Sequence, residues 1–218
     1  MSTWPVNPVD VIISKLRAGK QDMTIIDFGC GDANLARMLD KRFKGPHRVR
    51  SFDLHASEDG VVEMADSKSV PVRSKTADAA VFSLSLMGNN WVEFIREAKR
   101  VLKTQARLIV AEVLSRFARE KGDGKVESGV NDFIQVLKAE GFDLVKKVRL
   151  ARHFHNRYAK HTHQDSSNRM FIVMEFVKVA GESGLSSTKK PSKGKASSGN
   201  ISIVDPSHLL KPCVYKKR

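Results

Sequence analysis

The sequence has only two cysteines, Cys30 and Cys213, and no apolar run long enough to cross a bilayer. Two cysteines so far apart do not build a disulfide framework, so we expect a reducing compartment. A bilayer span needs about 20 apolar residues, and the first residues, MSTWP, show no signal-peptide pattern. These absences exclude the disulfide-rich secreted class and predict no membrane association.

Acidic residues are scarce relative to basic ones. The chain has 38 Lys and Arg against 24 Asp and Glu, which gives a net charge of +14. Because the basic residues come in clusters, this excess predicts a polyanionic partner, most simply RNA, bound through phosphate contacts that weaken with salt. The alternative is a basic protein with scattered lysines. Apolar residues make up 41% of the 218 residues, enough for the core of one α/β domain, which we expect over residues 1–180.

The most informative stretch runs from Thr24 to Ala36, TIIDFGCGDANLA. A short apolar strand pattern leads to Asp27, glycines follow at Gly29 and Gly31, and a helix-forming segment comes next. Glycine permits a sharp turn and the close approach of a ligand, and the start of a helix offers free N–H groups to whatever lies over the loop. The pattern is typical of a nucleotide-like cofactor site at the end of a first parallel strand, although an ordinary strand-to-helix turn can carry the same glycines.

Acids follow two further strand patterns, at Asp53 and Asp66. An acid after the second strand is where a ribose is hydrogen-bonded in such folds. The third glycine of the dinucleotide fingerprint is missing, and an acid-lined loop would repel a pyrophosphate. Acids around one pocket instead suit a cofactor without phosphates that carries positive charge. S-adenosylmethionine, with its ammonium, sulfonium, ribose diol and adenine amino group, fits that description. The acids in question are Asp27, Asp32, Asp53 and Asp66.

Three motifs carry a resemblance to a known family: DFGCGD at 27–32, FDL at 52–54 and AVFSLSLMGNN at 80–90. They are similar to the Rossmann-like methyltransferases and, more closely, to the ribosomal RNA-processing protein 8 (nucleomethylin) family. The resemblance runs from Trp4 to about Val177 and resumes near the C-terminus. It implies an S-adenosylmethionine-dependent methyltransferase that releases S-adenosylhomocysteine. The expected product is 1-methyladenosine in large-subunit ribosomal RNA, formed during ribosome biogenesis in the nucleus and nucleolus.

Two other functions stay open from the sequence. The family's link to nucleolar silencing complexes implies, as one alternative, a non-catalytic or chromatin-associated module that binds the cofactor and has nucleolar protein complexes as partners. Methylation of a protein or a small molecule is the other, and the basic composition counts against a small substrate. We expect a monomer whose main partner is ribosomal RNA or a pre-ribosome.

The resemblance implies a Rossmann-like class I α/β fold with a seven-stranded, mostly parallel sheet, helices on both faces and an antiparallel C-terminal hairpin. Apolar patterns predict strands near 24–28, 48–53, 61–64, 79–86 and 107–113, and hairpin strands at 142–149 and 170–177. The unbroken run at 79–86 is typical of a central strand buried on both faces. Helices are predicted over 9–17, 91–102 and 131–138, and after each of the first two strands.

By resemblance, the glycine loop and the acids bind the cofactor. Asp53 would bind the ribose hydroxyls and Asp66 the adenine amino group, with the backbone of Ser67 beside it. For Ser83, a role as a buried strand residue is nearly as well supported as a role in cofactor binding. The predicted cofactor-binding residues are Asp27, Gly29, Gly31, Asp53, Leu54, Asp66, Ser67 and Ser83.

The substrate side is predicted where the fourth and fifth strands end. Methyl transfer needs the acceptor lone pair, methyl carbon and sulfur held in line. N1 of an unpaired or flipped adenine already has a free lone pair, so we assign no general base. Glu112 could instead pair locally, and Arg116 could cap a helix or hold a phosphate. The predicted substrate-side residues are Met87, Gly88, Asn90, Glu112 and Arg116.

The remaining segments are polar. Four histidines in 152–163 have spacings that zinc could use, but an RNA-facing loop with interleaved basic and aromatic residues is favoured, so no metal site is predicted. Residues 181–200 are mostly Gly, Ser and Lys and predict a disordered linker. Its basic cluster at 189–195 is either a nuclear import signal or an arm for RNA. Residues 201–218 regain hydrophobicity and predict a basic tail segment that docks on the domain or on a partner.

Overall fold

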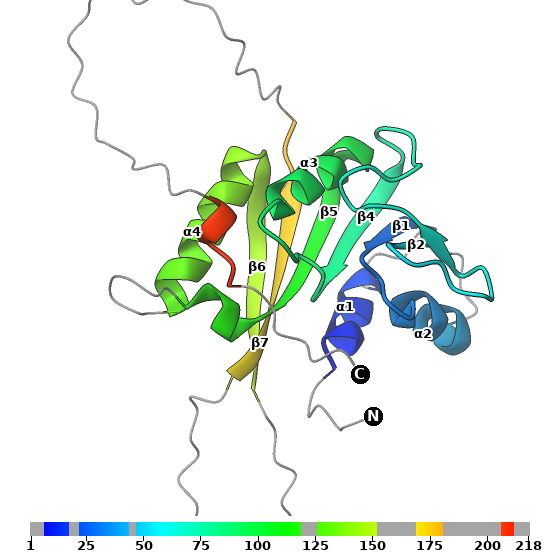
Figure 1. Cartoon of the computed structure of the whole chain (residues 1–218), viewed down its shortest axis with the longest axis horizontal. Helices are drawn as coiled ribbons and strands as arrows, with labels where there is room; N and C mark the ends of the chain where they lie inside the picture. The colour runs from blue at the N-terminus through cyan, green and yellow to red at the C-terminus, as the bar shows by residue number, and fades with distance from the viewer. Residues whose placement is uncertain are drawn as a thin grey trace, which may run out of the picture.

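One mixed sheet organises the molecule. A computed structural model describes residues 7–17, 22–43, 47–118, 126–151, 169–180 and 206–211. Within these ranges the strands are β1 (Thr24–Phe28), β2 (Arg48–Asp53), β3 (Val62–Met64), β4 (Ala77–Ser83), β5 (Leu102–Val113), β6 (Phe142–Ala151) and β7 (Arg169–Lys178). They form a 7-stranded sheet in the order β3-β2-β1-β4-β5-β7-β6 (Figure 1). Strands β1 to β5 pair in parallel, and β7 is antiparallel to both of its neighbours.

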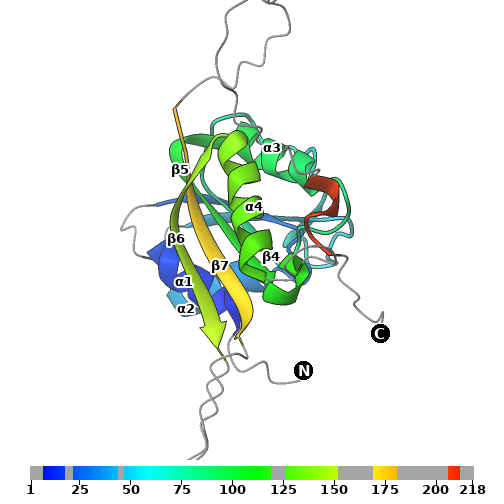
Figure 2. The ribbon, with the colours of Figure 1, turned by 90° about the vertical axis from the view of Figure 1, so that its left-hand side faces the viewer.

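Helices cover both faces of this sheet (Figures 1 and 2). They are α1 (Pro8–Arg17), α2 (Asn34–Phe43), α3 (Trp91–Val101) and α4 (Val126–Ala139), with short 3-10 turns η1 (Leu114–Phe117) and η2 (Pro206–His208). Neighbouring strand residues point to opposite faces. In β1, Ile25 packs with the apolar residues of α1 and α2, whereas Ile26 packs with those of α3 and α4. The predicted fold class is confirmed.

Several predicted elements differ from the structure, and α4 begins five residues before the helix predicted at 131–138. The strand predicted at 79–86 ends earlier, because Leu84 has a left-handed φ of 61° that takes the chain out of the sheet. Strand β5 begins five residues earlier than the predicted strand 107–113, at Leu102, and includes Gln105 at a left-handed φ of 62°. The prediction of a helix after the second strand is wrong. Residues 54–61 form a turn in which the Ser57 hydroxyl donates to Asp59 Oδ1 at 2.6 Å and accepts from Val62 N at 2.9 Å.

Several predictions concern segments beyond these ranges. The histidine-rich segment 152–163 and the linker 181–200 lie outside the described residues. Of the tail segment 201–218, residues 206–211 are described, and they pack on the domain through Leu209 and Leu210. Among the helices of the described ranges, none is long and apolar enough to cross a membrane.

Candidate cofactor and substrate site

The segments that follow four adjacent strands, β3, β2, β1 and β4, create the site. Strand β1 lies between β2 and β4, so the loops that follow these strands meet at one edge of the sheet. The first loop turns at Gly29 and Gly31, whose φ values of 61° and 54° are left-handed. A Cβ at Gly29 would lie 2.6 Å from the Cβ of Ser85, closer than side chains can approach. Glycine at this position therefore lets the loop after β1 pack directly on the loop after β4.

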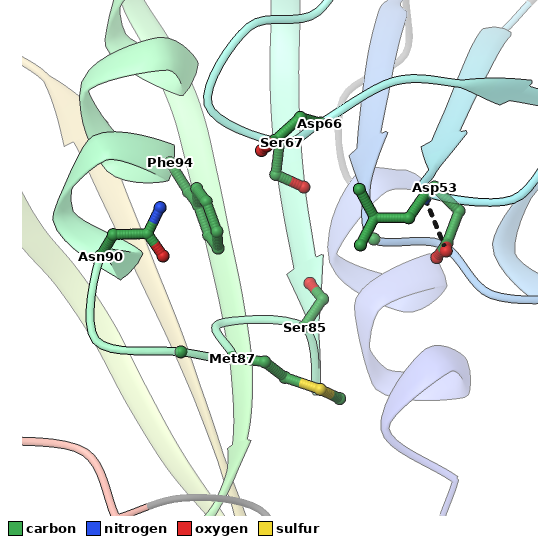
Figure 3. Close-up of a pocket in the computed structure, with 10 residues that line it drawn as sticks. Asp53, Asp66, Ser67, Ser85, Met87, Asn90 and Phe94 are labelled. Carbon is green, nitrogen blue, oxygen red and sulfur yellow. Dashed lines mark hydrogen bonds between the residues drawn. The ribbon is translucent and has the colours of Figure 1, made fainter.

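A cavity of about 380 Å³ opens at this edge. Figure 3 shows Asp53 on one side, Asn90 and Phe94 on the opposite side, and Ser85 and Met87 between them on the chain that follows β4. The residues that line the cavity are Gly29, Asp53, Leu54, Asp66, Ser67, Ser85, Met87, Gly88, Asn90 and Phe94.

Asp53 ends β2 with its carboxylate held by two backbone amides. Gly31 N donates to Asp53 Oδ2 at 2.8 Å, and Leu54 N donates to Asp53 Oδ1 at 2.8 Å. Each carboxylate oxygen can accept more than one hydrogen bond. The two amides therefore fix the orientation of Asp53 and leave it able to accept hydrogen bonds from a ligand in the cavity.

Asp66 and Ser67 lie in a tight turn after β3. The backbone N–H of Ser69 donates to the carbonyl of Asp66 at 2.9 Å, and Lys68 N donates to Asp66 Oδ1 at 3.0 Å. The ammonium of Lys68 is 3.3 Å from Asp66 Oδ2 in a half-exposed ion pair. The turn thus presents a carboxylate and a serine to the same cavity, opposite the ring of Phe94 (Figure 3).

Asp27 and Ser83 line a second, smaller cavity of about 190 Å³, together with residues from the start of α1 and α2. The Asp27 side chain is 2% exposed, and its Oδ1 has no hydrogen-bond partner among the described residues. Burial, and then the nearby charge of Asp53, raise the pKa of Asp27 to about 7. The same causes, with Asp27 itself, raise the pKa of the neighbouring Cys30 thiol to about 12, so it stays protonated and is no nucleophile.

The predicted cofactor-binding residues therefore divide between the two cavities. Five of them line the larger cavity: Gly29, Asp53, Leu54, Asp66 and Ser67. Asp27 and Ser83 line the smaller one. Gly31 lines neither, and it contributes through the hydrogen bond of its amide to Asp53.

On the substrate side, Met87, Gly88 and Asn90 line the larger cavity as well. They belong to residues 84–90, which we call the β4–α3 loop. Its backbone is unusual, because Leu84 and Gly88 both have left-handed φ values, 61° and 82°. The Ser85 hydroxyl ties the loop to β1 by donating to the carbonyl of Phe28 at 2.6 Å, and Asn90 Nδ2 donates to Glu93 Oε2 at 3.0 Å.

Glu112 and Arg116 line neither cavity, so the structure does not place them in contact with a substrate. They form a buried ion pair behind the β4–α3 loop, with side chains 0% and 4% exposed and 2.7 Å between Arg116 Nη1 and Glu112 Oε2. Burial raises the pKa of Glu112, and the adjacent guanidinium partly offsets this. Glu112 is thus paired locally, which is the alternative that the sequence left open for it. Both side chains hold the backbone of Leu86, and this role was not predicted.

Two residues that line the larger cavity, Ser85 and Phe94, were missed. Ser85 lies in the same apolar run as Ser83, and the run gives no sign that the chain leaves the sheet between them. Phe94 follows Asn90 by one helical turn, and its apolar neighbours in α3 indicated a core position. In the ranges that the structure describes, no group of three or more His, Cys, Asp or Glu side chains is placed to hold a metal ion.

Comparisons with known proteins give relatives that match essentially the whole chain, including the following two. Ribosomal RNA-processing protein 8 of Dictyostelium discoideum is 34% identical over 220 residues, which cover 100% of this chain and 47% of that protein. The 25S rRNA (adenine(645)-N(1))-methyltransferase of Saccharomyces cerevisiae is 30% identical over 256 residues, which cover 100% of this chain and 59% of that protein. The chain thus spans about half the length of these curated relatives. The resemblance predicted from the motifs is confirmed.

The structural comparison agrees at the level of the fold. A SAM dependent methyltransferase from Aquifex aeolicus has a TM-score of 0.54 and 16% identity, over 80% of this chain and 92% of that one. Such a low identity shows the fold alone. A family model described as "Hypothetical methyltransferase" matches residues 1–156. The chain therefore belongs to this methyltransferase family.

Proposed function

We propose that this chain binds S-adenosylmethionine and transfers its methyl group to N1 of an adenine in large-subunit ribosomal RNA, during ribosome biogenesis. The observation that carries the proposal is the cavity at the ends of β1, β2 and β4, where a fixed carboxylate, Asp53, faces a turn with Asp66 and Ser67. The names of the relatives, which refer to ribosomal RNA processing and adenine-N1 methylation, support this substrate. They also support a pre-ribosomal partner and a nuclear, nucleolar location.

The chemistry of the two cavities fits such a cofactor. The free lone pairs of Asp53 suit the two hydroxyls of a ribose, and the carboxylate of Asp66 suits the amino group of an adenine. The Oδ1 of Asp27, which has no hydrogen-bond partner in the part of the chain that the structure describes, suits an ammonium group. Acids line both cavities, which favours a cation over a phosphate. When bound, S-adenosylmethionine supplies an electrophilic methyl group on a sulfonium.

The chain's own residues would then orient the acceptor and exclude water. An adenine that has left its base-paired stack would enter between the β4–α3 loop and Phe94. Positioning carries most of the rate, since N1 already has a free lone pair. Methylation at N1 moves positive charge from the sulfur to the base. The carboxylates of Asp53 and Asp66 near the cavity would stabilise this charge without rearranging.

Calorimetric titration of S-adenosylmethionine into the chain tests the cofactor. We expect binding that weakens at least tenfold in Asp53→Ala. A matched control is Asp59→Ala, because Asp59 is an exposed acid after β2 that pairs with Arg37 at 2.6 Å and lines neither cavity. If the parent chain did not bind S-adenosylmethionine, or if Asp53→Ala and Asp59→Ala lost affinity equally, the assigned site would be contradicted.

Methylation of ribosomal RNA fragments tests the reaction. A methyl group on N1 blocks Watson–Crick pairing. Reverse transcription should therefore stop at the modified adenine in RNA treated with the parent chain, and read through in RNA treated with Asp53→Ala. Cofactor binding without any methyl transfer to RNA would instead favour the non-catalytic, chromatin-associated module. We further propose residues 1–180 as the catalytic domain, 181–200 as a linker and 201–218 as a basic tail segment.

A further inference from the structure

We infer that the C-terminal segment Pro206–Lys211 braces the β4–α3 loop and thereby positions the acceptor base, with Arg116 as the connecting residue. What the loop does rests on the proposed function. The docking of the segment rests on contacts in the structure.

The segment is held to the domain by apolar and polar contacts. Leu209 and Leu210 are 9% and 4% exposed and belong to the same core cluster as Trp91 and Phe117. The indole Nε1 of Trp91 donates to the carbonyl of Pro206 at 2.9 Å. Figures 1 and 2 show the segment, in red, lying against the layer formed by α3 and α4. Trp91 is the first residue of α3 and directly follows the β4–α3 loop.

Arg116 joins this segment to the loop. Its Nε donates to the carbonyl of Lys211 at 2.9 Å, and Lys211 N donates back to the carbonyl of Arg116 at 2.9 Å. Its Nη2 donates to the carbonyl of Leu86 at 2.7 Å. One planar guanidinium therefore holds the end of the C-terminal segment and the middle of the loop at the same time.

Glu112 completes the connection from the other side. It pairs with Arg116 at 2.7 Å and accepts a hydrogen bond from Leu86 N at 3.1 Å. Both backbone polar groups of Leu86 are thus satisfied by this ion pair. Because the pair is buried, loss of one of its partners leaves a polar group without compensation, which destabilises the whole arrangement.

Leu86 immediately precedes Met87 and Gly88, which line the larger cavity. The loop begins at a non-glycine residue with a left-handed φ, Leu84, and such a backbone persists only where its surroundings hold it. Release of the C-terminal segment would free one side of Arg116 and loosen Leu86. The proposed cofactor contacts are at Asp53, which ends β2, and at Asp66, in the turn after β3. Neither belongs to the β4–α3 loop, so cofactor affinity would change little.

The test uses the full chain with Trp4→Phe, so that Trp91 is the remaining tryptophan of the two. Leu209→Gln with Leu210→Gln should release the segment at constant charge. We expect a red shift of Trp91 emission and at least tenfold faster hydrogen exchange at the Leu86 amide. The kcat for RNA methylation should fall about 10- to 100-fold, and the Kd for S-adenosylmethionine should stay within about twofold.

Two further variants separate bracing from other roles. Replacing Lys216, Lys217 and Arg218 by Gln removes charge from the same tail; it should leave Trp91 emission and Leu86 exchange unchanged and raise only the KM for RNA. Arg116→Lys keeps the charge opposite Glu112, but an ammonium cannot reach both carbonyls. It should reproduce the fast Leu86 exchange and the low kcat while Leu209 and Leu210 stay intact.

Unchanged Leu86 exchange in both the Leu209/Leu210 variant and Arg116→Lys would overturn the inference. So would a kcat loss confined to the variant without the terminal charges. The proposed function fails separately: a parent chain that neither binds S-adenosylmethionine nor methylates RNA, yet shows the exchange and emission changes, would support the brace and refute the methyltransferase. Methylation that is insensitive to release of the segment would refute the brace and support the methyltransferase.

Discussion

Asp27 is a carboxyl group placed where ionisation is unfavourable. Burial and the charge of Asp53 raise its pKa from 3.8 to about 7. An acid whose pKa is higher in the folded chain binds its proton more tightly there than when unfolded. The contribution of Asp27 to stability is therefore present below about pH 4 and is lost as the pH rises to about 7.

Replacement of Asp27 by Asn should therefore stabilise the free chain at pH 8, by at least about 1 kcal/mol, and have little effect at pH 4. The same change should weaken S-adenosylmethionine binding, because the ammonium needs an ionised partner. Thermal unfolding and calorimetric titration at several pH values measure both effects; binding by the parent should weaken below about pH 7. Asp59→Asn is the control, since hydrogen bonds lower the pKa of Asp59 to about 2 and its replacement should not stabilise the chain at pH 8. A variant of Asp27 that is less stable at pH 8 would contradict this account.

At the residue scale, the sequence predicted the acids better than their neighbours. A carboxylate after a strand has few structural reasons to be there, so Asp53 and Asp66 stood out, and both line the larger cavity. Ser85 and Phe94 did not stand out, because serine and phenylalanine are ordinary in a buried strand and an amphipathic helix. Whether they face the core or a cavity depends on the left-handed turn at Leu84 and on how α3 packs, and neither is encoded in local periodicity.

At the scale of elements, the turn after β1 must fit against the β4–α3 loop. Gly29 and Gly31 both have left-handed φ values, so alanine at either costs roughly 1–2 kcal/mol. Only Gly29 also faces a neighbour at 2.6 Å, Ser85, whereas a Cβ at Gly31 meets nothing within 4 Å. Gly29→Ala should therefore lower the free energy of unfolding by about 1–3 kcal/mol more than Gly31→Ala.

Denaturant unfolding of the two variants measures this difference. Ser85→Gly removes the Cβ that causes the clash, and also the hydroxyl that donates to the carbonyl of Phe28. Measured against Ser85→Gly alone, the double variant Gly29→Ala with Ser85→Gly should therefore recover most of the excess loss, while the cost of the left-handed φ remains. Equal losses at the two glycines, or no recovery in the double variant, would show that the loops do not press on each other as the structure has them.

The elements themselves were predicted where a pattern is local. The bounds of β1 and β2 agree with the structure, because their apolar residues form short uninterrupted or alternating runs. The helix predicted after β2 is not observed, because the residues Ser57, Asp59 and Gly60 favour a turn instead. The apolar pattern thus located the strands, whereas the turn residues between β2 and β3 were not recognised.

At the scale of the whole molecule, the contacts that complete the site cross long distances in sequence. Arg116 and Lys211 are 95 positions apart, and Trp91 and Pro206 are 115 apart. The apolar residues of the tail predicted docking on the domain or a partner, but no local pattern could name Arg116 as the point of attachment. Such partners are fixed only when the sheet has brought η1 and the β4–α3 loop together.

Charge is likewise a property of the whole chain. The net charge is +14, yet acids line both cavities, so the contacts with RNA phosphates should lie mostly away from them. Binding of a single-stranded ribosomal RNA fragment with about five phosphate contacts should weaken about 100-fold between 50 and 200 mM salt. S-adenosylmethionine, which has no phosphates, should lose less than about threefold over the same range. Fluorescence anisotropy for the RNA and calorimetry for the cofactor measure the two slopes.

The basic cluster at 189–195 offers a way to locate part of that charge. Its lysines are Lys189, Lys190, Lys193 and Lys195, and each one that contacts a phosphate adds about 0.7 to the steepness of the logarithmic salt dependence. Replacing all four by Gln should flatten the RNA slope and leave the cofactor slope unchanged. A variant with the parent's RNA slope would show that this cluster does not touch RNA, which would favour its other predicted role as an import signal. An RNA affinity that does not depend on salt even in the parent would remove the charge argument for a polyanionic substrate altogether.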